Sequence, residues 1–210
     1  MVKYGMWVSA VVAVAVLASP ARPADDDQMI AESGALEIVL LRQPAVQKEL
    51  KLADTHTKKL HDFASGQWKK AKEIHKLPAK DQDAKYDALT KENETFLSEF
   101  LSKPQRSRLD QIAMQVAGLM WAGRPDVATA LKLTDGQKKA LHDLHKQAHK
   151  EMQAIHSETK SLDVKHEELK KLHETNTKRL LGLLTADQKA KWKELAGAEF
   201  TGELQFEAKK

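Results

Sequence analysis

The sequence predicts an all-α protein, a tandem pair of helical-hairpin units with short capping helices and an elongated shape. Three observations predict this class. Glycine and proline are scarce, at 9 and 6 of the 210 residues, while helix-favouring alanine, leucine, lysine and glutamate are abundant. The chain also matches itself at a fixed shift. Finally, one helix-start motif recurs at equivalent points of the two copies.

Residues 1–24 predict a signal peptide that precedes the folded part. Lys3 supplies a positive charge, and the segment from Met6 to Ala18 is almost wholly apolar. Small residues follow, which fits cleavage between about Ala21 and Asp25. The apolar segment is shorter than the roughly 20 residues that span a bilayer. We therefore expect a mature protein without a transmembrane segment, located in the periplasm or secreted.

Charge and cysteine content exclude several classes of function. The 34 basic and 30 acidic residues give a formal net charge of +4. This balance argues against a nucleic-acid partner, because nucleic-acid binders cluster an excess of basic residues on one face. The chain contains no cysteine, so disulfides, thiol catalysis and thiolate metal sites are excluded. Helix packing alone must then stabilise an exported protein.

An internal repeat organises the chain. At a shift of 81 residues, about thirteen of roughly 32 positions are identical between the segments that begin at Pro44 and Pro125, where chance would give about two. The match resumes after a two-residue slip, which aligns the segment at Leu101 with the segment at Leu184. We call the two aligned segments copy one and copy two.

Each copy predicts the same order of helices. A short apolar segment precedes a proline, which can open a short helix. A long helix follows, near 54–75 in copy one and 135–155 in copy two, and then a break and a return helix. Helices joined by such short breaks pack antiparallel. The expected units are residues 25–122 and 123–197, followed by a C-terminal tail, 198–210.

Capping boxes predict the start of a helix at three places. In such a box the Ser or Thr oxygen accepts a first-turn N–H, and the Gln side chain reaches back to the N–H of the Ser or Thr. The residues expected to form these boxes are Ser102 with Gln105, Thr134 with Gln137, and Thr185 with Gln188. At the fourth equivalent place both box residues are replaced, and Asp54 is expected to cap the helix instead.

These motifs resemble the repeated Leu-Thr-x-x-Gln motif of the Spy/CpxP-like periplasmic family. The matching segments are 133–137 and 184–188, with 101–105 a near match, and the resemblance covers roughly residues 44–195. It implies a secreted, all-helical protein that acts as an ATP-independent chaperone, a stress-signal modulator or a metal-responsive protein. It also implies a cradle-shaped homodimer, although two units in one chain can replace such a dimer.

Four histidines form a stripe on the expected long helix of copy two. His142, His145, His149 and His156 follow one another at spacings of three, four and seven. Imidazoles one turn apart, as at 145 and 149, can share a zinc, copper or nickel ion. The alternative is a flank of half-exposed polar residues, which soluble helices commonly carry. Copy one has no histidine at the positions equivalent to that pair, so a metal site would belong to copy two alone.

Three tryptophans, Trp68, Trp121 and Trp192, have two interpretations. Large aromatic side chains often dominate a protein-binding surface. Alternatively, each tryptophan fills a gap between helices.

The sequence contains none of the motifs of common enzymes: a P-loop, a dinucleotide-binding glycine loop and a Gly-x-Ser-x-Gly elbow are all missing. We therefore expect an exported helical binding protein rather than an enzyme. The interpretation that fits these observations best is a chaperone-like or envelope-stress protein that holds exposed apolar or unfolded segments, without a cofactor. A metal-binding or metal-sensing protein that uses the histidine stripe is the first alternative, and a structural envelope protein without a ligand is the second.

Overall fold

The computed structural model describes residues 35–204, so the expected signal peptide lies outside the described residues. Within this range every regular element is an α-helix, which confirms the all-α class. No helix in 35–204 is long and apolar enough to cross a membrane. The helices, in chain order, are α1 (Ala35–Leu41), α2 (Pro44–Glu49), α3 (Asp54–His75), α4 (Ala79–Phe100), α5 (Lys103–Ala117), α6 (Leu119–Ala122), α7 (Pro125–Ala130), α8 (Asp135–Ser157), α9 (Leu162–Leu183) and α10 (Ala186–Ala196).

The helix order is compatible with a tandem of two five-helix sets, α1–α5 and α6–α10. In each set a short helix precedes a second short helix that opens on a proline, Pro44 in α2 and Pro125 in α7. Proline suits this position because the first helical N–H has no partner within the helix. The two-residue slip of the sequence repeat falls at the hairpin turn, since α8 is one residue longer than α3 and its turn is one residue longer.

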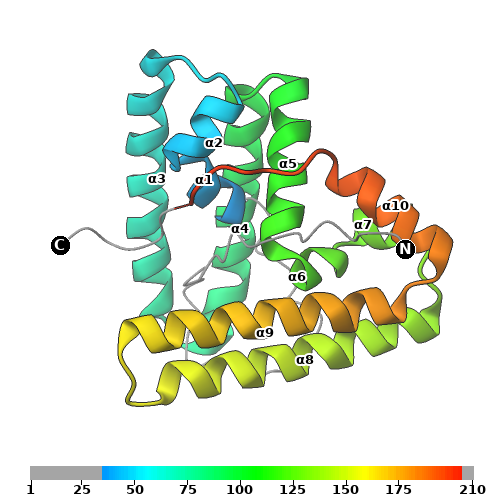
Figure 1. Ribbon diagram of the computed structural model, residues 1–210. Helices are drawn as coiled ribbons and strands as arrows, with labels where there is room; N and C mark the ends of the chain where they lie inside the picture. Colours follow the sequence, from blue (N-terminus) through cyan, green and yellow to red (C-terminus); the bar gives the residue numbers. More distant parts are fainter. Residues whose placement is uncertain (1–34, 205–210) are drawn as a thin grey trace.

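The two long hairpins run crosswise. In Figure 1, α3, α4 and α5 stand side by side, while the α8–α9 hairpin crosses their lower ends. The short helices α1 and α2 lie between α3 and α5, and α1 contacts α3, α4 and α5. The helix α6 contacts both α8 and α9, so it connects the second hairpin to the end of α5.

One hydrophobic core runs through both sets. Fully buried leucines come from α1 (Leu40 and Leu41), from α5 (Leu109) and from α9 (Leu180). Each such side chain contributes roughly 1.5–3 kcal/mol relative to exposure. Because the core is continuous, the two copies are packed together rather than joined by a free linker.

The segment after α10 returns to the first set. In Figure 1 it is drawn in red and crosses α5 toward α1 and α2. Phe200 is buried, and its N–H donates to Gln115 Oε1 on α5 at 2.8 Å. Arg108 of α5 donates to the Ala198 carbonyl at 2.7 Å. The described part of the expected tail, up to residue 204, is therefore packed against copy one.

Candidate functional site

The three expected helix-start motifs form capping boxes at the starts of α5, α8 and α10. Thr134 Oγ1 accepts the Gln137 N–H at 3.2 Å, and Gln137 Oε1 accepts the Thr134 N–H at 3.0 Å. Thr185 and Gln188 form the same pair of bonds, at 3.3 and 2.9 Å. At the third motif the Ser102 N–H donates to Gln105 Oε1 at 3.0 Å.

The fourth place differs from the expectation. Helix α3 begins at Asp54, and Ala53 occupies the N-cap position without a side-chain hydrogen bond. The expected cap by Asp54 is wrong because the helix starts one residue too early for Asp54 to be the cap residue. Alanine has no side-chain oxygen, so this end lacks the side-chain cap that α8 and α9 receive; the start of α4 at Pro78 lacks one as well.

The glutamines of the motifs also join separate helices. Gln137 Nε2 donates to Gln188 Oε1 at 2.6 Å, and Gln188 Nε2 donates back to Gln137 Oε1 at 3.0 Å. Gln137 also donates to the Leu183 carbonyl at 2.9 Å, at the end of α9. In copy one, Gln105 donates to the Leu50 carbonyl at 2.8 Å. These residues therefore position the hairpins and are already hydrogen-bonded within the protein.

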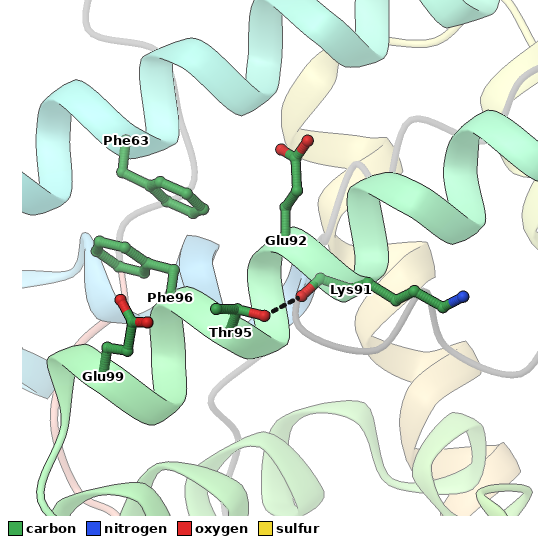
Figure 2. A pocket seen from close by; sticks show the side chains of 6 residues that line it. All are labelled: Phe63, Lys91, Glu92, Thr95, Phe96 and Glu99. Atoms are coloured by element: carbon green, nitrogen blue, oxygen red, sulfur yellow. Dashed lines mark hydrogen bonds between the residues drawn. The ribbon is translucent and has the colours of Figure 1, made fainter.

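An aromatic hollow opens on the surface between α3 and α4. Phe63 of α3 stacks on Phe96 of α4 with ring centroids 3.8 Å apart and planes 4° apart. Phe96 in turn stacks on Phe100 at 4.8 Å. The hollow measures about 400 Å³, and Figure 2 shows the two facing rings within it. We call it the aromatic hollow; its lining residues are Phe63, Lys91, Glu92, Thr95, Phe96 and Glu99.

Charges of both signs surround the rings of the aromatic hollow. Glu92 forms an ion pair with Lys70 and accepts a hydrogen bond from Gln67 at 3.0 Å. The hydrogen bond from Lys70 holds the pKa of Glu92 below its usual value. Lys59 lies 6.0 Å from the centre of the Phe96 ring. Figure 2 shows the Lys91 side chain directed away from the rings and Glu99 beside Phe96. The rim thus carries no single sign of charge.

Copy two has no equivalent pair of aromatic rings. The repeat places Arg179 at the position of Phe96 and Leu144 at the position of Phe63. Arg179 Nη1 donates to Glu151 Oε2 of α8 at 2.8 Å and to Asn176 Oδ1 at 3.1 Å. An ion pair therefore joins α8 to α9 where copy one has stacked rings. The stacked rings belong to copy one and are not a necessary feature of the helical hairpin.

The histidine stripe divides between buried and partly exposed positions. His145 is only 4% exposed, and His142 and His149 are half-buried. One ring nitrogen of His149 lies 2.7 Å from Gln153 Nε2. The side chain of His156 lies outside the described part of the structure. Among the described residues there is no group of three or more His, Asp or Glu side chains placed to hold a metal ion.

The tryptophans occupy three different environments. Trp121 is buried, and the Arg124 guanidinium lies 4.4 Å from its ring centre. Trp192 is half-buried and packs against the core. Trp68 is 45% exposed on α3, with Lys72 5.3 Å from its ring centre. Trp121 and Trp192 therefore fill gaps between helices, whereas Trp68 lies on the surface.

A charged cluster lies where copy one meets copy two. Glu37 of α1 is fully buried and contacts Arg106 of α5 at 3.5 Å and Arg124 at 3.4 Å. A second hollow, of about 520 Å³, adjoins both arginines. Burial raises the pKa of Glu37 to about 7, against the lowering effect of its own backbone N–H and of the two arginines.

Neither the aromatic hollow nor this cluster is predictable from the spacing of residues in the sequence. Nothing in the spacing of residues along one helix shows that Phe96 of α4 stacks on Phe63 of α3. Glu37 offered one signal, because it is a lone acid within an otherwise apolar run, 36–41. A buried charge is stable only with partners, and here both partners are distant in sequence.

No family model, curated protein sequence or solved structure matches the chain at a significant level.

Proposed function

We propose that this chain is an exported, non-enzymatic binding protein that holds exposed apolar segments of unfolded or partly folded polypeptides. The observation that carries the proposal is the aromatic hollow between α3 and α4. The half-buried ring of Phe63 stacks on the buried ring of Phe96 beside a surface hollow, which offers apolar area to a partner, and copy two has Leu144 and Arg179 at the equivalent positions, with Arg179 paired to Glu151. The resemblance to the Spy/CpxP-like periplasmic family supports the same function and an extracytoplasmic location.

The mixed charges at the rim of the aromatic hollow favour binding of partners of either charge. Glu92 and Glu99 are balanced by Lys59 and Lys91, so neither acidic nor basic partners are repelled as a class. A shallow surface of this size gains little after the cost of ordering a flexible partner. We therefore expect dissociation constants in the micromolar range, roughly −8 kcal/mol, with only partial weakening by salt.

A pair of substitutions tests this function at equivalent positions of the two copies. Thr95 is exposed and lines the aromatic hollow, and its counterpart in copy two is Lys178, which is also exposed. Thr95→Lys places a long charged side chain across the rings, whereas Lys178→Thr makes the reverse change where the stacked rings are missing. Phe63→Leu, which copies Leu144, removes half of the stack while keeping an apolar side chain.

The measurement is binding of reduced, carboxymethylated α-lactalbumin, a permanently unfolded polypeptide, together with suppression of aggregation of reduced insulin at near-equal concentration. Thr95→Lys and Phe63→Leu should each weaken binding by about fivefold or more, which is roughly 1 kcal/mol. Lys178→Thr should bind like the parent protein. If the parent protein neither binds nor protects the unfolded chains, the holding function is wrong and a structural role gains support.

A further inference from the structure

Glu37 occupies an unusual position for a carboxylate. It lies on α1 with no exposed surface, between one arginine of its own copy and one arginine at the start of the other copy. Arg106 Nη2 lies 3.5 Å from Glu37 Oε1, and Arg124 Nη1 lies 3.4 Å from the same oxygen. Arg124 directly precedes α7, so Glu37 connects the first helix set to the second.

Each arginine also has a carboxylate of its own. Arg106 contacts Asp110 at 3.0 Å and Glu94 at 3.1 Å. Arg124 makes two bonds to Asp126, at 3.1 and 3.2 Å, and packs over Trp121. The charged groups around Glu37 therefore come from α4, α5 and the start of α7. The cluster contains four carboxyl groups and two guanidinium groups. Ionisation of Glu37 therefore adds a negative charge where carboxylates already outnumber the positive groups.

The cluster is not a repeated feature of the fold. The repeat places Gly118 at the position of Glu37 and Lys189 at the position of Arg106. In copy one the residue equivalent to Arg124 is Gln43, which carries no charge. The buried acid and both of its arginines were thus assembled at one place only, where the two copies meet.

We propose that Glu37 is a proton-controlled link between the two copies: protonated, it keeps α1 packed against the start of copy two, and ionised, it favours opening of this contact. Binding of a proton to the Glu37 carboxyl therefore controls the contact between the two copies. The moving parts are the α8–α9 hairpin, which follows Arg124, and the three-helix layer of copy one, which contains Arg106.

Thermodynamic linkage determines whether a rise in pH opens or closes this contact. Burial raises the pKa of Glu37 from 4.5 to about 7, and the arginines and a backbone N–H offset only part of this effect while Asp110 adds to it. In the open arrangement the Glu37 carboxyl is hydrated and binds a proton less tightly than it does when buried. A rise in pH therefore favours the open arrangement. Between pH 4.5 and pH 7 the shift in the opening equilibrium amounts to on the order of a hundredfold. Below pH 4.5 the carboxyl is protonated in both arrangements and the effect ends.

Spin labels can measure the opening directly, because the chain contains no cysteine that would compete for the label. Lys69 on α3 and Lys150 on α8 are both exposed and lie on different hairpins. With labels at Lys69→Cys and Lys150→Cys, the distance distribution should be narrow at low pH and should broaden to longer distances by pH 8.5, with a midpoint between the ordinary pKa of a glutamate and the raised pKa of Glu37, about 7.

Three variants of this labelled, full-length chain identify the group that titrates. Glu37→Gln should keep the narrow distribution at every pH. Asp110→Asn should retain the transition with a lower midpoint, because it removes a negative charge that raises the pKa of Glu37. Arg124→Gln should move the midpoint to higher pH. Glu167→Gln, an exposed acid on α9, is the control and should behave like the parent.

The proposal is overturned if the distances do not depend on pH, or if Glu37→Gln retains the transition. Should Glu37→Gln fail to fold, judged by its circular dichroism, the titration of the Glu37 carboxyl carbon by nuclear magnetic resonance in the parent protein decides the matter. A midpoint near that of a free glutamate, about 4.3, would equally overturn the link.

Discussion

Lys51 and Lys132 adopt the same left-handed backbone conformation, each with a φ of +51°, 81 residues apart in the chain. Each lysine follows a short helix that opens on a proline. The N–H of the next residue donates five residues back in both copies, Leu52 to Gln47 at 2.9 Å and Leu133 to Ala128 at 3.0 Å. This is the bonding of a Schellman helix end, at which glycine is the usual residue. The two copies thus share a turn that their side chains do not favour.

Glycine at either position should stabilise the protein. A residue with a Cβ atom costs about 1 kcal/mol in the left-handed region, and glycine removes that cost. Lys51→Gly and Lys132→Gly should each raise the free energy of unfolding by about 0.5–1 kcal/mol in urea titrations. Lys48→Gly, inside α2, is the matched control and should lower it by a similar amount. Destabilisation by both Lys51→Gly and Lys132→Gly would mean that the turns differ from those described.

The Gln137–Gln188 pair should show strong energetic coupling. Each amide donates to the other across two helix starts, so removal of one partner leaves the other with an unsatisfied group. Gln137→Ala and Gln188→Ala should each cost about 1–2 kcal/mol, and the double variant should cost less than their sum by about 1 kcal/mol. The measurement is a double-mutant cycle of urea unfolding, and strict additivity would contradict the pairing.

The fold class was predictable from the sequence because its signals are local. Helix propensity, apolar spacing and the capping boxes each act within a few residues, and all of them favour the same helices. The motif pairs at Thr134 and Thr185 form in the structure with the donor and acceptor roles that a capping box requires. The repeat in turn predicted that helices recur in the same order.

The candidate binding surface was not predictable, because it depends on how helices meet. The stack of Phe63 on Phe96 joins residues of α3 and α4 whose facing sides no periodicity reports. The link at Glu37 joins residues 69 and 87 positions apart in the chain. Likewise, the spacing of His145 and His149 shows that they share a helix face, but it does not show that the side chain of His145 is buried.

Metal binding by the histidine stripe remains a prediction from the sequence, and the structure makes its expected strength specific. His145 is buried, so a metal that bridges it to His149 has to displace packing between α8 and its neighbours. We therefore expect zinc, copper and nickel to bind no tighter than about 100 micromolar at neutral pH, roughly −5.5 kcal/mol. Titration calorimetry on the parent protein measures this directly.

Two double variants show whether any observed metal affinity belongs to the stripe. Replacing His145 and His149 with glutamine should abolish it, whereas the same change at His61 and His75 of copy one should have little effect. Affinity tighter than 100 micromolar that disappears only in the first variant would establish the metal site and contradict the expectation of weak binding.

The stability of the protein should fall in acid through His173. This histidine of α9 is half-buried, and its ring lies next to Gly118, where a Cβ atom would come within 3.3 Å of His173 Cε1. Burial lowers the pKa of His173 below 6.5, and the nearby Glu174 offsets this only in part. The unfolded chain therefore binds the proton more readily, so the free energy of unfolding decreases as the pH falls below 6.5. Above that pH the ring is neutral in both states and contributes no pH dependence.

Glu37 acts in the opposite sense over an overlapping range, because its raised pKa makes stability fall as the pH rises from 4.5 to about 7. The contribution of His173 is therefore best measured in the Glu37→Gln background, by urea unfolding at intervals between pH 4.5 and pH 7.5. In this background stability should decline below pH 6.5, and adding His173→Gln should flatten the decline. An equally steep decline in the double variant would assign the acid sensitivity to other groups. Such a result would also mean that the contact between α9 and Gly118 does not exclude water from the His173 ring.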